Sequence, residues 1–283
     1  MVSRILRKIY RFFYFGNRKY DDYRSFLIKA KLNNYEFKPL KEFVKKRNSN
    51  QKIIGLRHDV DTNLDLSIKI AEIEKEEGIK STYFILHTAK YFYQNIEKEI
   101  LHPKLIQKLK YLQNDLGHEI GIHSDLMPIE HIYKLSPKEY LKKTIKLLDD
   151  NGIDIKGIAG HGNLFKNIYM KNFKKKNHKI QNKNIYSNPH IIFDPKDFLL
   201  EYEAYSLDHD LYYSDSDFIK NKRWDFTELK NRFFNYKNKR VIILTHAVHW
   251  SNSILVYYSL NFFIIVKYFF KYLLELYKFI NSK

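Results

Sequence analysis

The stretch Ile53-Ile54-Gly55-Leu56-Arg57-His58-Asp59-Val60-Asp61-Thr62 holds the features that decide the fold. It begins as an apolar run typical of a buried strand and ends in two carboxylates beside a cation. Alternate side chains of a strand point to opposite faces, so we expect Arg57, Asp59 and Asp61 on one face and His58 on the other. Two neighbouring carboxylates repel each other unless a cation lies between them. The stretch alone therefore predicts either a metal site or the cap of the following helix.

From this stretch onward, strand and helix patterns alternate along the chain. The sequence Ser136-Pro137-Lys138-Glu139 has the form of a capping box with proline in the first turn. The region 165–205, which is rich in Lys and Asn, predicts loops with short elements. The alternation predicts an α/β fold with parallel strands in a sheet or barrel. We expect strands at 53–58, 82–86, 118–123, 153–159, 211–213 and 240–245, and helices at 21–32, 64–77, 103–115 and 137–151.

The 283 residues divide into three predicted parts. Residues 51–252 are expected to form one barrel-like domain with a sizeable core, residues 1–50 an N-terminal helical extension, and residues 253–283 a C-terminal apolar helix. Residues 1–16 are basic and amphipathic, which predicts a helix that packs on the domain or lies on a membrane surface. The C-terminal helix has one narrow polar stripe, so it packs on the domain, on a partner or in the bilayer interface. Charged residues interrupt it too often for a transmembrane span.

The composition limits the partners and the chemistry. A net charge of +18 suits nucleic acid, an anionic membrane or an acidic polysaccharide, but no nucleic-acid-binding motif is present, so we expect no nucleic-acid partner. The absence of cysteine excludes thiolate chemistry and leaves His, Asp and Glu as metal ligands. Basic residues interrupt the N-terminal apolar run before a signal peptide can form. We therefore expect a cytoplasmic protein, with peripheral contact to the inner face of the membrane through the terminal helices.

Histidines follow several of the predicted strands, at the level where the two Asp also lie. They are His87, His123, His161 and His246. In a parallel barrel these strand ends meet at one face, where active sites are built. One histidine at such a place is more often structural than catalytic. The set of four histidines with two Asp, however, predicts a metal site with catalytic neighbours.

Three blocks of the sequence resemble a known superfamily. The blocks Arg57-His58-Asp59-Val60-Asp61, Ser81-Thr82-Tyr83-Phe84-Ile85-Leu86 and Gly117-His118-Glu119-Ile120-Gly121-Ile122-His123 are similar to those of the polysaccharide deacetylases (NodB-homology, carbohydrate esterase family 4). Within them the chain most resembles the WbmS-like branch from surface-polysaccharide clusters, to which residues 213–216 and 244–250 also look similar. The resemblance implies a distorted (β/α) barrel of the NodB-homology type. It also implies a divalent metal, with zinc as the first choice, and removal of acetyl groups from N-acetylated sugars.

The resemblance implies roles for the acids and for the late histidines. Asp59 matches the catalytic base and Asp61 the metal ligand, although one residue separates them where the superfamily has adjacent Asp, so their roles stay interchangeable. Arg57, on the same face, would orient the base. His246 matches the late histidine that serves as the general acid. His249 stands where Trp is expected and is a minor candidate.

The metal histidines depart from the superfamily's pattern. His123 matches the first of them, and His118 matches a histidine of the same block that does not bind metal, which we interpret as structural. The second metal histidine is expected four residues after His123, where this chain has Met127. Asp125 is close but differs in spacing. We predict that His161, at the end of the next strand, is the substitute ligand.

These residue types suit hydrolysis of an acetamide. A bound metal lowers the pKa of its water and polarises the carbonyl, Asp59 takes the water's proton, and protonated His246 donates to the leaving amine. The mixed set of His and carboxylate ligands suits zinc, and also iron, cobalt or manganese. Two alternatives stay open. The sequence Asp59-Val60-Asp61 is also the D-x-D motif of metal-dependent glycosyltransferases, and Met127 fits a non-catalytic protein that binds a glycan or scaffolds a complex.

Overall fold

A computed structural model of the chain describes residues 20–45, 52–163, 168–169, 193–215 and 240–250. The predicted helices at 1–16 and 254–280 lie outside these residues. The helices are α2 (Tyr20–Leu32), α3 (Leu40–Lys45), α4 (Leu64–Glu76), α5 (Leu105–Lys110), α6 (Leu126–His131) and α7 (Pro137–Asp150), with short turns η1 (Tyr111–Asp115), η3 (Pro195–Phe198), η4 (Ala204–Ser206) and η7 (Ala247–Trp250). The strands are β1 (Tyr35–Lys38), β2 (Lys52–Val60), β3 (Thr82–Leu86), β4 (Tyr93–Asn95), β5 (Ile100–Leu101), β6 (Glu119–Ser124), β7 (Ile155–Gly160), β8 (Gly162–Asn163), β9 (Ile168–Tyr169), β10 (Tyr202–Glu203), β11 (Leu211–Ser214) and β12 (Arg240–Thr245).

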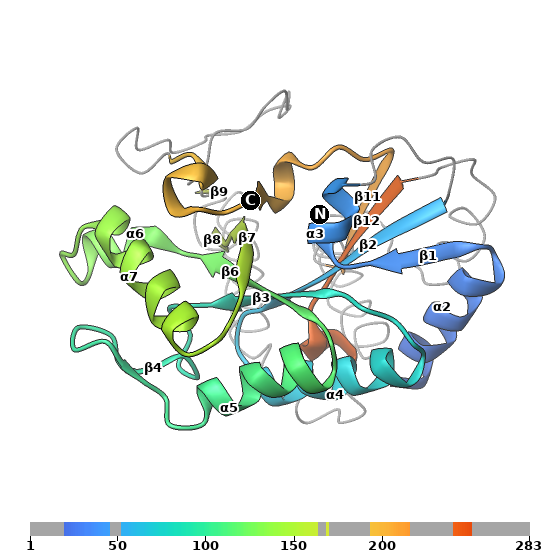
Figure 1. Cartoon of the computed structure of the whole chain (residues 1–283), viewed down its shortest axis with the longest axis horizontal. Coiled ribbons are helices and arrows are strands. Elements are labelled where there is room, and N and C mark those ends of the chain that lie inside the picture. Colours follow the sequence, from blue (N-terminus) through green and yellow to red (C-terminus); the bar gives the residue numbers. More distant parts are fainter. Residues whose placement is uncertain (1–19, 46–51, 164–167, 170–192, 216–239, 251–283) are drawn as a thin grey trace, which may run out of the picture.

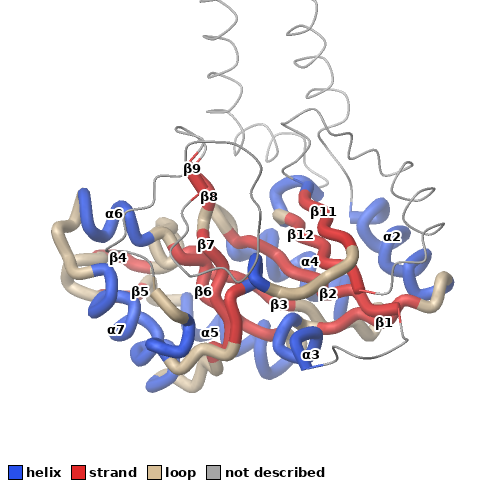
Figure 2. The backbone as a smooth tube through the Cα atoms, turned by 90° about the horizontal axis from the view of Figure 1, so that it is seen from above, coloured by secondary structure: helices blue, strands red, loops and turns tan. Residues whose placement is uncertain are grey.

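Eight strands form one parallel sheet that curls into a half-barrel (Figures 1 and 2). Its order is β10-β7-β6-β3-β2-β12-β11. Strand β1 pairs with the first half of β2, on the same edge of β2 whose second half pairs with β3. Every neighbouring pair in this sheet is parallel. The predicted α/β fold with parallel strands is therefore confirmed. The short edge strands β1 and β10 were not predicted, because elements of four and two residues carry little periodicity.

Helices α2, α4, α5 and α7 follow one another around the outer side of the sheet (Figure 1). Helix α4 begins after Asn63, whose side chain accepts a hydrogen bond from the Leu66 amide. The cap of this helix is thus Asn63 and not the Asp pair, which rejects the capping interpretation of Asp59 and Asp61. The helix predicted at 103–115 is divided, since α5 continues into the π-helical turn η1.

A buried polar network lies between α4 and the outer face of β2. The carboxylate of Glu74, which is fully buried, accepts hydrogen bonds from Tyr23, from Ser81 Oγ at 2.5 Å and from Tyr83 at 2.9 Å. His58 Nε2 lies 2.7 Å from the same carboxylate. His58 therefore points to the face opposite Asp59, as the alternation of β2 predicts. The network ties α2, α4, β2 and β3 together through one ionised group.

Large side chains fill the inner face of the sheet at its lower end, which is the end away from the carboxyl ends of the strands. Helix α3 packs Leu40 and Phe43 into this space, beside Phe84 of β3 and Tyr202 of β10. A Cβ atom on Gly157 would lie 2.1 Å from the Tyr202 ring, so β7 needs glycine at this position to let the ring approach. The half-barrel is thus a packed core below the ends of its strands.

No helix in the part of the chain that the structure describes combines the length and the apolar character needed to cross a membrane.

Candidate functional site

The register of the parallel strands brings the predicted site residues to one edge of the sheet. His123 of β6 pairs with Leu86 of β3 on one side and with Ala159 of β7 on the other. Thr245, the last residue of β12, pairs with His58 of β2, so His246 follows at the level of Asp59. Because all these strands are parallel, their carboxyl ends share one edge, as in parallel barrels whose active sites lie there.

Arg57 and Asp59 form a buried ion pair on the inner face of β2. Arg57 Nη2 lies 2.9 Å from Asp59 Oδ1 and 2.7 Å from Oδ2, and Arg57 Nε lies 3.1 Å from Oδ1. The guanidinium lies 5.0 Å from the centre of the Phe84 ring and 4.4 Å from that of Tyr205. Burial alone would raise the pKa of Asp59, but Arg57 and nearby histidines hold it below its usual range. Asp59 is therefore an oriented carboxylate that is ionised and able to accept a proton.

His123 and Asp61 face each other with no hydrogen bond between them. Nδ1 of His123 lies 3.0 Å from the carbonyl oxygen of Ala159, which can only accept, so Nδ1 carries the proton. His123 Nε2 then lies 3.3 Å from Asp61 Oδ1 and 3.4 Å from Asp59 Oδ2. Asp61 Oδ1 is buried and has no hydrogen-bond partner. A buried carboxylate oxygen of this kind needs positive charge beside it, and a metal ion between Oδ1 and Nε2 would supply that charge.

His161 completes a triad with the same two residues. Its Nε2 lies 3.9 Å from Asp61 Oδ2, its ring centre lies 5.0 Å from that of His123, and one donor atom from each of the three residues falls within 4.8 Å of the others. Ligands 2.0–2.2 Å from a tetrahedral ion lie about 3.3–3.6 Å apart. The 3.3 Å between Asp61 and His123 matches this spacing, whereas His161, at 3.9 Å from Asp61, would have to move a few tenths of an ångström closer. The donor types of the three residues suit a divalent metal.

His246 belongs to a second cluster beside the first. Its Nδ1 lies 2.5 Å from Asp215 Oδ1, and Asp215 Oδ2 accepts from the His246 amide at 2.6 Å and lies 3.0 Å from His249 Nδ1. A separation of 2.5 Å is a direct hydrogen bond and is too short for two ligands of one ion. Burial would lower the pKa of His246, but Asp215, Asp61 and Asp59 raise it to about 10, so its imidazole is a cation at neutral pH. Its Nε2 lies 3.7 Å from Asp61 Oδ2.

Three other candidates from the sequence lie outside this arrangement. His87 is buried and its Nε2 accepts a hydrogen bond from the Asp125 amide at 3.0 Å. His118 lies 3.1 Å from the Ala71 carbonyl oxygen and 3.2 Å from the Ser81 amide, which is a structural environment. Met127 packs partly buried against the outer core.

Sequence analysis gave no role to Asp215. Its side chain is fully buried against His246. The signal that could have found it is an acid directly after the strand that pairs with β12, since parallel neighbours that end in an acid and a histidine place the two together.

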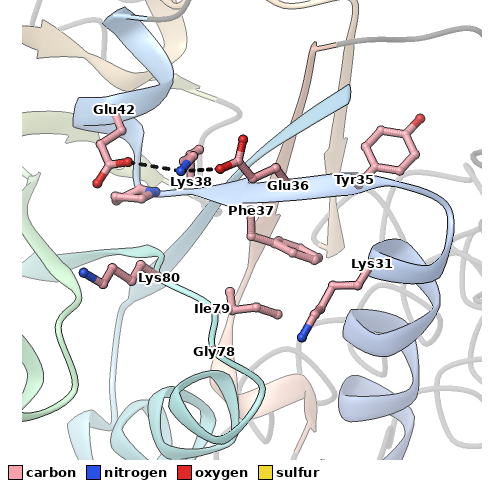
Figure 3. Close-up of a pocket in the computed structure, with 10 residues that line it drawn as sticks. Lys31, Tyr35, Glu36, Phe37, Lys38, Glu42, Gly78, Ile79 and Lys80 are labelled. Atoms are coloured by element: carbon pink, nitrogen blue, oxygen red, sulfur yellow. Dashed lines mark ion pairs between the residues drawn. The ribbon is translucent and has the colours of Figure 1, made fainter. Parts of the chain in front are cut away.

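A separate groove of about 360 Å³ lies at the opposite end of the strands (Figure 3). Phe37 and Ile79 lie at its centre, and Lys31 and Lys80 at its sides. Lys38 is neutralised there by two neighbouring glutamates, at 2.5 Å and 3.5 Å. None of the residues named above as site residues lines this groove.

Comparison with known proteins yields similarities among solved structures. No protein-family model matches the chain, and no curated protein matches it. The chain is similar to a pseudoenzyme of carbohydrate esterase family 4 from Bacillus anthracis, with 15% identity and a TM-score of 0.40 over 71% of this chain and 56% of that one. A variant of that pseudoenzyme with restored enzymatic activity matches equally, over 58% of its length. The chain thus spans less than two thirds of these proteins.

Two further structures cover more of their own length. One is a family 4 carbohydrate esterase from Bacillus anthracis, with 17% identity and a TM-score of 0.38 over 82% of this chain and 86% of that one. The other is the chitin deacetylase of the fungal pathogen Colletotrichum lindemuthianum, with 16% identity and a TM-score of 0.38 over 76% of this chain and 80% of that one. The solved structures to which this chain is similar are therefore carbohydrate esterases of family 4 and deacetylases, all at low sequence identity.

Proposed function

We propose that the protein is a metal-dependent deacetylase that removes acetyl groups from N-acetylated sugars of a surface polysaccharide or its precursor. The observation that carries this proposal is the arrangement of Asp61 and His123, whose Oδ1 and Nε2 atoms face each other 3.3 Å apart. On one side of them lies an oriented carboxylate, Asp59, and on the other a cationic imidazole, His246. The blocks that resemble the polysaccharide deacetylases, and their WbmS-like branch, contain Asp59, Asp61, His123 and His246, whereas His161 lies outside them.

Each residue has one role in the proposed reaction. Asp61, His123 and His161 would hold a divalent metal, with zinc as the first choice because of the mixed nitrogen and oxygen ligands. A metal bound there lowers the pKa of water and polarises the carbonyl of an acetamide. Asp59 accepts the proton of the attacking water, while Arg57 holds this carboxylate in place through two nitrogens. His246 donates a proton to the nitrogen of the leaving amine.

The proposal is tested by metal analysis of the purified protein together with acetate release from N-acetylated saccharides. We expect about one equivalent of zinc, and acetate release that stops after chelation and returns with added metal. A protein that binds no metal and releases no acetate would instead be a non-catalytic member of the fold. Metal-dependent binding of a nucleotide sugar, without acetate release, would favour the glycosyltransferase that the D-x-D motif allows.

The substitution His246→Gln is expected to lower the rate of acetate release by about 10²-fold, because glutamine cannot protonate the leaving amine. Zinc content should stay unchanged, since His246 is not among the proposed ligands. The matched control is His102→Gln, at an exposed histidine that is not among the proposed site residues, which should keep full activity. Loss of zinc from the His246 variant would show that this residue is a ligand instead.

We further propose peripheral contact with the membrane through the terminal segments, which lie outside the described residues. The support is the amphipathic and apolar sequence of residues 1–16 and 254–280. The full chain is expected to sediment with membranes, whereas a chain without residues 254–283 is expected to stay in the supernatant. A full chain that remains in the supernatant would contradict this proposal.

A further inference from the structure

To act as a ligand, His161 requires a neighbouring group that orients its ring, because packing within the sheet does not fix the ring. It follows the end of β7, and its side chain is 24% exposed. Its backbone amide donates to the Ser124 carbonyl at 2.8 Å, which fixes the main chain but does not set the direction of the ring. The orientation of the ring therefore depends on its polar neighbours.

The polar neighbour of His161 on the side away from Asp61 is Asp125. Asp125 Oδ2 lies 3.4 Å from His161 Nδ1, and its side chain is 16% exposed. A carboxylate beside Nδ1 favours the tautomer that has its proton on Nδ1. Nε2 then keeps its electron pair, and this is the atom that faces Asp61 Oδ2 at 3.9 Å. Metal-bound histidines commonly donate their second nitrogen to a carboxylate in this way.

The main chain at Asp125 is held in place by a hydrogen bond to a buried histidine. Its backbone amide donates to His87 Nε2 at 3.0 Å, and His87 Nδ1 lies 3.3 Å from the hydroxyl of Tyr140 on α7. His87 is fully buried, so it is placed by the core and not by the site. A continuous series of contacts thus leads from α7 through His87 and Asp125 to His161.

We propose that Asp125, held by His87, is a positioning residue that fixes the tautomer and the direction of His161, so that this histidine can replace the ligand missing at Met127. The inference rests on the proposed function, since it takes His161 as a ligand. It explains how the replacement is possible: Met127 lies in α6 with its side chain partly buried against the core, whereas Asp125, just before α6, reaches the histidine of the neighbouring strand.

The test is a titration of the full chain with zinc against a competing chelator, for Asp125→Ala and Asp125→Asn. Asp125→Ala removes the acceptor and is expected to weaken zinc binding about 10–100-fold. Asp125→Asn keeps a neutral acceptor and is expected to weaken binding less. Asp149→Ala, at an exposed acid of α7, is the control for loss of a negative charge and should leave the affinity unchanged. Nitrogen-15 spectra of the metal-free protein, recorded at a pH high enough for the His161 ring to be neutral, should show His161 protonated on Nδ1, and should lose this preference in Asp125→Ala.

A second arm shows whether Asp125 acts through His161. In a His161→Ala background, Asp125→Ala should cause no further loss of affinity, because the ring that it positions is gone. An equal loss in both backgrounds, or an unchanged affinity and tautomer in the single variant, would overturn the positioning role while the metal site itself stands. Failure of the unaltered protein to bind zinc would instead reject the proposed function.

Discussion

Asp59→Asn is expected to lower acetate release by about 10²–10⁴-fold while zinc remains bound. Asparagine has nearly the size of aspartate, but it cannot accept the proton of the attacking water. The change also leaves the guanidinium of Arg57, which is fully buried, without its counter-charge. Removing one partner of a buried ion pair costs about 3–5 kcal/mol of stability. The rates should therefore be compared per folded molecule, at a temperature well below the midpoint of unfolding of the variant.

Two further variants make this result specific. Asp65→Asn, at an exposed acid in the first turn of α4, is the matched control and should keep both activity and zinc. Asp61→Asn should lose zinc and activity together, because the proposed ligand is removed. If Asp59→Asn loses zinc and Asp61→Asn keeps it, the roles of the two acids are exchanged. An Asp59→Asn variant with more than a tenth of the original rate would show that Asp59 is not the base.

Glu74→Gln is expected to lower the free energy of unfolding by about 3–5 kcal/mol, measured with urea. Glu74 accepts from Tyr23, Ser81 and Tyr83 and pairs with His58, all in a fully buried space. An amide has only one oxygen to accept and brings two donors of its own, so several buried donors lose their partner. The control is Glu76→Gln two residues along α4, where an exposed ion pair with Arg24 contributes at most about 1 kcal/mol.

The same carboxylate makes stability depend on pH. Burial would raise the pKa of Glu74, but the neighbouring His58 and the hydrogen bonds lower it to about 2. In the unfolded chain this carboxyl takes up a proton near pH 4.3. Its contribution is therefore complete above about pH 4.3 and is lost as the pH falls toward 2. The fall in stability over this interval should be smaller in Glu74→Gln, and equal falls in both proteins would show that another group is responsible.

The sequence predicts the central strands and the face of β2 that carries the site. Six apolar runs correspond to β2, β3, β6, β7, β11 and β12, because a buried parallel strand needs continuous apolar residues. The alternation of β2 correctly separates Arg57 and Asp59 from His58. These features depend only on residues that are close together in the chain, so they can be predicted from the sequence alone.

The partners of the site residues could not be predicted, since they depend on which strands become neighbours. Asp215 meets His246 because β11 pairs with β12, and Asp125 meets His161 because β6 pairs with β7. Glu74 lies on the apolar stripe of α4, four residues after Ile70, but a charged residue there does not reveal its partners, and only the packing of α4 against β2 shows the buried network. His87 was grouped with the other strand-end histidines, yet its ring lies beneath the edge, among core residues.

The filled lower end of the half-barrel closes the described part of the site from below. Below Asp59 lie Arg57 with its two aromatic neighbours, and then the side chains from α3 and β10. Asp59 is only 3% exposed, whereas Asp61 is 33% exposed at the strand ends. In the described part of the structure, a ligand therefore approaches Asp59 from the strand ends and not from below. For the proposed deacetylase, this packed floor would limit the size of the acyl group that reaches Asp59.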